Sequence, residues 1–163
     1  MRKRILLAVV LLFGGLDCAA QTGGVTGEWR GIRTNPAGFV FSATMTLEAG
    51  PGCKTCAVMS DGLIKGRIVW TLRKAGSKAP SGQDASTGLT ASELVKGEMK
   101  GDGLLVLNGY EKDDPNGIIE LDQYRLAVSD NGKVIGGITL NGGSWTGQFI
   151  AMRSQPMERS APQ

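Results

Sequence analysis

The chain has 163 residues, of which 18 are basic, 15 are acidic and none is histidine. The lack of histidine excludes Ser-His and Cys-His nucleophile pairs and removes the most common zinc ligand and neutral-pH acid or base. The nearly balanced charge does not indicate a surface for nucleic acid or for an anionic membrane. We therefore expect a protein without catalytic activity, metal or cofactor that does not bind nucleic acid.

The first 20 residues are typical of a secretory signal peptide. A basic start, Met1-Arg2-Lys3-Arg4, precedes an apolar run from Ile5 to Phe13, and the small residues Cys18-Ala19-Ala20 follow. Because this run is shorter than the roughly 20 residues that a spanning helix needs, we expect cleavage after Ala20 and export to the periplasm or the medium. Integral membrane association is not expected. Lipid attachment through Cys18 is the alternative.

From Gly27 onward the apolar residues alternate with a period of two, which is typical of antiparallel strands with one buried face. Residues 21–26 lead into the single folded domain, 27–153, and residues 154–163 are expected to form a disordered tail. We predict eight strands, at residues 27–34, 39–48, 63–73, 93–99, 103–110, 117–128, 133–140 and 144–153. The phase changes inside the sixth strand, which predicts a β-bulge near Asp122 and Gln123.

Most of the connections are short. Segments 100–103, 114–117, 130–132 and 141–143 are rich in Gly, Asn and Asp, as tight hairpin turns require. Successive short turns predict an up-and-down meander. The connections at 49–62 and 74–92 are longer, and because a meander turns at alternate ends, we expect these two at opposite ends of the sheet.

The longer connection at 49–62 contains Cys53 and Cys56. In an oxidising compartment these two thiols are expected to form a structural disulfide. A thiol-disulfide redox site or a metal site is the alternative, although nothing in the sequence predicts the helix start that thioredoxin-type motifs need.

The pattern Gly-x-Trp-x-Gly occurs at both ends of the predicted domain, as Gly27, Trp29 and Gly31 and as Gly143, Trp145 and Gly147. Side chains two apart share a face of a strand, so each indole lies between two positions without side chains. Rolling up the sheet would remove both exposed edges and bring the first strand beside the last. Closure places Trp29 near Arg153 and Trp145 near Arg33. Arg33 then either covers that indole or is a solvated strand end.

Gly27 and Trp29 on the first strand, with Arg153 on the last, resemble the lipocalin and avidin-type barrels that are grouped as calycins. The segment Gly66-Arg67-Ile68-Val69-Trp70 is also similar to a strand of small exported bacterial barrels. The resemblance implies an all-β fold, an eight-stranded antiparallel up-and-down β-barrel. It also implies that Gly27, Trp29 and Arg153 close one end of the barrel, which is a structural role.

Large side chains share the predicted inward face, and they either fill the barrel or line a pocket in it. They are Trp29, Phe41, Met45, Trp70, Leu72, Met99, Tyr124, Trp145 and Phe149. As a ligand site we predict Trp70, Met45, Tyr124 and Phe41, holding a small apolar or amphipathic molecule in a monomeric protein.

Two carboxylate pairs, Asp113 with Asp114 and Glu120 with Asp122, are expected to be solvated. An alternative function is a protein-interaction or inhibitor module of the cell envelope that uses loops 49–62 and 74–92.

Overall fold

The computed structural model describes residues 24–49, 64–76, 87–100, 103–141 and 143–154, and of Asn141 and Trp145 only the main chain. The predicted signal peptide, the pair Cys53 and Cys56, Cys18 and the predicted tail after Ser154 lie outside these residues. The strands are β1 (Gly27–Thr34), β2 (Val40–Ala49), β3 (Ile64–Lys74), β4 (Thr90–Met99), β5 (Leu104–Asp113), β6 (Gln123–Val128), β7 (Val134–Asn141) and β8 (Ser144–Arg153).

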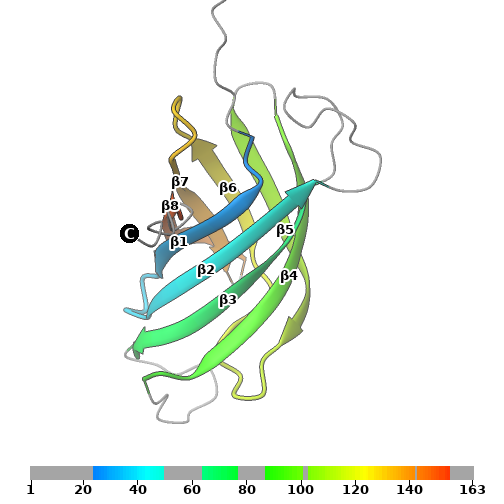
Figure 1. Cartoon of the computed structure of the whole chain (residues 1–163). Helices are drawn as coiled ribbons and strands as arrows, with labels where there is room; N and C mark the ends of the chain where they lie inside the picture. Colours follow the sequence, from blue (N-terminus) through cyan, green and yellow to red (C-terminus); the bar gives the residue numbers. More distant parts are fainter. Residues whose placement is uncertain (1–23, 50–63, 77–86, 101–102, 142, 155–163) are drawn as a thin grey trace, which may run out of the picture.

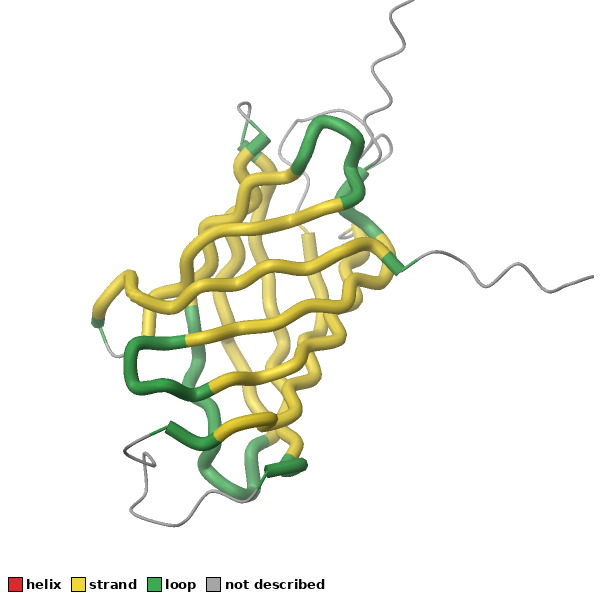
Figure 2. Tube along the Cα trace, turned by 90° about the vertical axis from the view of Figure 1, so that its left-hand side faces the viewer, coloured by secondary structure: helices red, strands yellow, loops and turns green. Residues whose placement is uncertain are grey.

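The eight strands form one closed barrel in which each strand pairs antiparallel with its neighbours in the sequence, as Figure 1 shows. The barrel closes where β1 pairs with β8, with Trp29 opposite Arg153 and Arg33 opposite Phe149. Viewed from the side, the described chain consists of strands and connecting turns (Figure 2). The predicted all-β, up-and-down barrel is therefore confirmed. Among the described residues there is no helix long and apolar enough to span a membrane.

The tight turns also agree with the sequence. Each of the four predicted turn segments ends on a glycine with positive φ, at Gly103, Gly117, Gly132 and Gly143, although the connection that contains Gly117 continues to Asp122. Glycine takes this backbone conformation without steric cost, so the chain reverses within a few residues. The ends of β2, β3 and β4 place the two longer connections at opposite ends of the barrel, as predicted.

The prediction for the sixth strand was wrong in its first half. β6 begins at Gln123, and residues 117–122 are not strand. The carboxylate of Asp114 accepts hydrogen bonds from the main-chain amides of Ile118 and Ile119, each at 2.9 Å, so these amides are not available to a sheet ladder. The expectation that Asp114 is solvated was wrong as well, because its side chain is fully buried in this turn.

The predicted β-bulge near Asp122 is absent, because the ladders of β6 with β5 and with β7 run without a register shift. A shift occurs instead between β4 and β5, where Leu94 pairs with Glu111 while Val95 pairs with Gly109. The extra residue on β5 bends that strand. It also brings Gly109 next to the segment that precedes β6, since the Gly109 amide donates to the carbonyl of Asp122 at 2.8 Å.

Alternate side chains of the strands fill the barrel. The largest buried apolar side chains are Trp29, Met45, Leu47, Ile68, Trp70, Leu72, Leu105, Leu107, Tyr124, Leu126 and Ile135. Toward the end where β1 finishes and β4 starts, five aromatic rings follow one another at centroid distances of 5.8–6.2 Å, in the order Phe39, Phe41, Trp70, Phe149, Tyr124. The polar groups described next lie against these rings.

Candidate functional site

Three charged side chains from distant parts of the chain meet inside the barrel. They are Arg33 near the end of β1, Glu93 near the start of β4 and Asp122 directly before β6, and we call them the charged cluster. Their exposed fractions are 2%, 1% and 1%. Transfer of charged groups from water to such an interior is unfavourable unless they are paired and hydrogen-bonded, so the contacts of each group matter.

The strand phase explains why these side chains point inward. Arg33 has the same parity as the buried Trp29, Glu93 the same parity as Val95, and Asp122 the same parity as Tyr124. Their positions lie at the end of the barrel where the β1–β2, β3–β4 and β5–β6 connections are found. The closed register then brings the three inward positions together.

Arg33 and Asp122 form a buried ion pair, with Arg33 Nη2 2.6 Å from Asp122 Oδ2. Arg33 Nε also donates to Thr139 Oγ1 at 3.4 Å. The guanidinium carbon lies 5.9 Å from the ring centroid of Phe41 and 5.7 Å from that of Trp70. A guanidinium suits this place because it can pair with a carboxylate and rest on aromatic faces at the same time.

Glu93 is held by two aromatic residues through a single oxygen. The indole Nε1 of Trp70 donates to Glu93 Oε1 at 2.9 Å, and the hydroxyl of Tyr124 donates to the same oxygen. The second oxygen, Oε2, lies over Gly109, where a Cβ atom would collide with it and would also lie 3.2 Å from the Asp122 carbonyl. The absence of a side chain at Gly109 thus makes room for the Glu93 carboxylate.

Burial dominates the acid-base properties of the cluster. It raises the pKa of Glu93 above the usual value for glutamate, against the hydrogen bonds from Tyr124 and Trp70, the main-chain amide of Asp122 and the charge of Arg33, which lower it. Burial likewise raises the pKa of Asp122 to about 7, with Arg33 opposing the shift and Glu93 and Glu120 adding to it. The pKa of the Tyr124 hydroxyl is well above its ordinary value for the same reason, so it remains a proton donor.

Several oxygens of the cluster have no donor. Arg33 Nη2 and Asp122 Oδ2 lie 2.6 Å apart, but neither atom has a hydrogen bond in good geometry. Among the described residues, Glu93 Oε2 and Asp122 Oδ1 also have no hydrogen bond in good geometry, although the main-chain amide of Asp122 acts on the Glu93 carboxylate. Buried polar atoms in folded proteins are nearly always hydrogen-bonded, so unpartnered ones call for an explanation. The carboxylate oxygens among them are acceptors when ionised, and they can take hydrogen bonds from a bound molecule.

The cluster has two chemical capacities. A carboxyl group with a pKa near neutrality can take up or release a proton, and a buried carboxylate can bind a hydrogen-bond donor. Within the described part of the chain, no three Asp, Glu, Cys or His side chains gather in a way that would hold a metal ion. The aromatic side chains and the unpartnered acceptor oxygens favour binding of an organic molecule that carries a hydrogen-bond donor.

The structure brings three of the four predicted ligand residues to this cluster. Trp70 and Tyr124 contact Glu93, and Phe41 lies under the guanidinium of Arg33. Met45 is fully buried but lies further along β2, opposite Trp29 and Ile68 in the ladders, so it belongs to the middle of the barrel.

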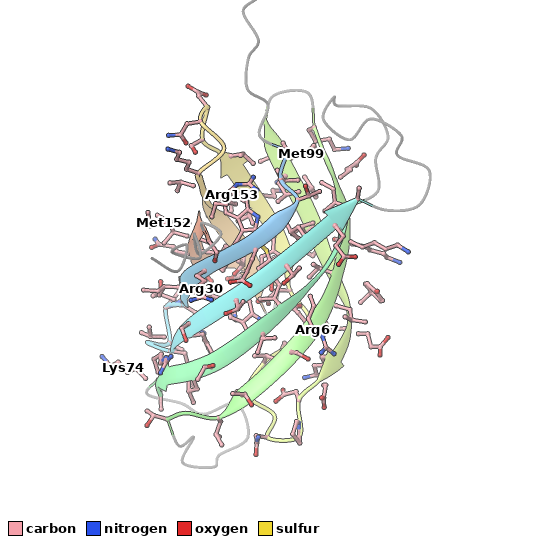
Figure 3. The ribbon with its side chains drawn as sticks, in the orientation of Figure 1. Arg30, Arg67, Lys74, Met99, Met152 and Arg153 are labelled. Carbon is pink, nitrogen blue, oxygen red and sulfur yellow. The ribbon has the colours of Figure 1, made fainter. Side chains whose placement is uncertain are left out.

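Three of the predicted closure residues, Gly27, Trp29 and Arg153, lie at the opposite end. The guanidinium of Arg153 is 4.4 Å from the ring centroid of Trp29 and donates to the carbonyls of Gly24, Thr26 and Gly132. Arg153 and its neighbour Met152 are labelled in Figure 3, where Met152 points outward. Gly27 makes room for Arg153. Gly147 lies instead at the end of the charged cluster, where it makes room for the Thr139 hydroxyl that accepts a hydrogen bond from Arg33. The side chain of Trp145 is not among those described.

The charged cluster was not anticipated from the sequence. Of the two alternatives for Arg33, the solvated strand end is wrong, because Arg33 is buried against Phe41 and Trp70. Asp122 is not on a solvated face with Glu120, because it turns into the barrel while Glu120 stays exposed. Glu93 was not considered at all. The available signal was a charged residue in the inward phase of a strand, which is rare enough to mark each of the three positions.

Other sequence predictions concern segments outside the described residues. Most of loops 49–62 and 74–92 lies outside the described residues, so the interaction-module alternative remains a prediction. The same holds for the disulfide and the redox alternative. No protein-family model, no curated protein and no solved structure matches the chain. The charged cluster is therefore the strongest guide to function.

Proposed function

We propose that the protein is a binding module that holds the polar end of a small amphipathic ligand against Glu93 and Asp122. The observation that carries the proposal is a pair of carboxylates, each 1% exposed, of which Glu93 Oε2 and Asp122 Oδ1 lack a hydrogen-bond donor inside a barrel that is lined mostly by apolar side chains. Export of the protein, supported by the pattern of residues 1–20, and a calycin-type relationship, supported by the contact of Trp29 with Arg153, belong to the same proposal.

Stability alone is a poor reason for this arrangement. Replacing a buried ion pair with apolar side chains of similar volume is often neutral or stabilising, so a barrel optimised only for stability would not need these charges. Ionisable groups with shifted pKa values are instead common at functional sites. Here two carboxyl groups with raised pKa values lie together at one end of a barrel, where small-molecule sites of such folds are found.

The apolar part of the ligand would lie among the aromatic rings next to the cluster. Trp70 packs edge-on against both Phe41 and Phe149, at 6.1 and 5.8 Å between centroids. Phe39 stacks on Phe41 and, with 4% exposure, covers this end of the barrel. Because Phe39 lies in the turn before β2, displacing it would open the path to Trp70 and Glu93 without breaking a strand.

The experiment is a titration with N-phenyl-1-naphthylamine, an amphipathic probe that becomes fluorescent in apolar surroundings. We expect saturable binding of one probe per chain. Glu93→Gln should weaken binding at least about tenfold, which corresponds to the loss of about 1.4 kcal/mol. Phe39→Ala should strengthen it, because the ligand no longer has to displace the ring.

A surface variant on the same strand provides the control. Glu98→Gln changes a half-exposed glutamate of β4 that pairs with Lys100, and it should bind the probe like the wild type. Circular dichroism establishes whether each variant keeps the barrel. Absence of saturable binding to the wild type, or equal binding by folded Glu93→Gln, would contradict the proposed function.

A further inference from the structure

We propose that the ligand of the charged cluster is a primary amine on an apolar chain, bound as its ammonium ion by Glu93 and Asp122. This inference rests on the proposed function and specifies the chemical class of the ligand. It depends on three features of the cluster: its charge balance, its unpartnered acceptors and its one buried cation, which already has partners.

The charge balance favours a cation. The charged cluster inside the barrel consists of Arg33, Glu93 and Asp122, so two carboxylates face one guanidinium. Ionisation of both carboxyl groups leaves one negative charge uncompensated in a low-dielectric interior. A carboxylate ligand would add a third negative charge, whereas an ammonium ion would complete the balance.

The guanidinium of Arg33, the one cation of the charged cluster, already has partners. Arg33 pairs with Asp122, donates to Thr139 and lies on the rings of Phe41 and Trp70. An anionic ligand would have to compete with Asp122 for this guanidinium and leave that carboxylate buried without a partner. Loss of one partner from a buried pair is strongly unfavourable, so the cluster is not a site for a fatty acid or a phosphate.

Most of the missing contacts are hydrogen-bond donors. Glu93 Oε2 and Asp122 Oδ1 are acceptors without partners in the described structure, whereas the one nitrogen without a hydrogen bond, Arg33 Nη2, already lies 2.6 Å from Asp122 Oδ2. A primary ammonium group has three N–H donors and no acceptor, so it can serve both carboxylates at once. A hydroxyl has one donor, and a trimethylammonium group has none. The cluster therefore favours an ammonium ion over an alcohol of the same chain length, and an alcohol over a quaternary amine.

Protonation of the carboxylates in the charged cluster should compete with binding of the amine. Burial gives Asp122 a pKa of about 7, so lowering the pH below neutrality neutralises a carboxylate that the ammonium ion needs. The groups that face Asp122 are Arg33, Glu93 and Glu120, and Glu93 responds in the same direction because its pKa is also raised. Amine binding should therefore weaken from pH 8 to pH 5.5, while alcohol binding should change little.

The test is isothermal calorimetry with four octyl compounds, octylamine, 1-octanol, octanoate and octyltrimethylammonium, on the full chain at pH 8. We expect octylamine to bind at least about tenfold tighter than 1-octanol, and the other two to bind more weakly still. Asp122→Asn and Glu93→Gln should each reduce octylamine affinity at least about tenfold and bring it near that of 1-octanol. Glu98→Gln should leave all four affinities unchanged.

The outcomes separate the two proposals. If 1-octanol or octanoate binds as tightly as octylamine, the ligand class is wrong while a binding module remains. If octyltrimethylammonium equals octylamine, charge alone acts and the role of the unpartnered acceptors is refuted. If none of the four compounds and no N-phenyl-1-naphthylamine binds, the proposed function itself fails. Should Glu93→Gln not fold, the ratio of octylamine to octyltrimethylammonium affinity in the wild type still decides.

Discussion

The guanidinium of Arg33 lies 2.6 Å from the carboxylate of Asp122 in the interior of the barrel. This contact joins the first strand to the segment before the sixth, 89 positions further along the chain by their numbers. It therefore ties together elements that do not pair in the sheet, at the end of the barrel that carries the candidate site.

Arg33→Met should destabilise the barrel by about 3–5 kcal/mol, because the change leaves Asp122 buried without its partner. Urea unfolding followed by tryptophan fluorescence measures this loss. The double variant Arg33→Met with Asp122→Leu should recover most of it, since neither charge then remains inside. Arg67→Met is the matched control, because Arg67 is exposed on the outer face of β3, and it should change stability by less than about 0.5 kcal/mol. Equal losses in the single and double variants would refute the role given to the pair.

The stability of the protein should fall as the pH rises from about 4 to about 7. Asp122 has a pKa of about 7 in the folded protein against an ordinary value of 3.8, so the folded state keeps a proton that the unfolded chain releases in this window. The stabilisation is complete below the unfolded pKa and is lost once the pH passes the folded one. The full effect of this group is on the order of 4 kcal/mol.

Asp122→Asn isolates this contribution, because asparagine cannot titrate. Unfolding free energies of both proteins at pH 4, 5.5, 7 and 8 provide the measurement. The wild type should lose stability relative to the variant across the series, with little further change between pH 7 and 8. Parallel curves for the two proteins would show that the buried carboxyl does not titrate near neutrality.

The barrel was predictable from local pattern, and the charged cluster was not. The alternation of apolar and polar residues in 39–48 and 63–73, together with glycine at the turns, indicates strands with one solvated and one buried face. This pattern can be recognised without knowledge of distant contacts. The meeting of Arg33, Glu93 and Asp122 depends on the shear with which eight strands close, and one sequence does not reveal that shear. The parity of each residue can mark it as an inward charge, but it does not show which other charged side chains that residue meets.

The sixth strand shows a second reason for failure. Ile118, Ile119 and Leu121 are apolar enough to continue a strand, but the Asp114 carboxylate takes the amides of Ile118 and Ile119. A side chain that captures main-chain donors competes with the sheet ladder, and apolar alternation carries no information on this competition.

Arg153→Met should open the end of the barrel opposite the charged cluster. The variant loses three hydrogen bonds to main-chain carbonyls and the contact with the Trp29 ring, for which we expect a loss of about 2–4 kcal/mol. Arg153→Lys should recover less than half, because one ammonium group cannot reach three carbonyls from the same backbone position. Hydrogen exchange should show faster opening of β1 and β8 than of β3. Met152→Ala, on the exposed face of the same strand, is the control and should leave the exchange pattern intact.

Replacement by alanine should change the stability of the protein in opposite directions at two glycines. At Gly31 a Cβ would lie 2.6 Å from the Cβ of Ala151 and closer still to the carbonyl of Ile150, at the seam where β1 meets β8. Backbone atoms cannot give way as a flexible side chain can, so Gly31→Ala should destabilise by about 1–3 kcal/mol or more. At Gly136 the nearest atoms are 3.7 Å away, which is ordinary contact.

Gly136→Ala should therefore be neutral or stabilising by about 0.4–1 kcal/mol, because alanine restricts the unfolded chain more than glycine does. Thermal unfolding of both variants in the same buffer measures the difference. Since both glycines lie inside strands of one barrel and neither has a positive φ, backbone propensity affects them alike, and only the closeness of the facing strand differs. Equal losses at the two positions would mean that strand propensity, and not the tight seam between β1 and β8, explains the glycine at position 31.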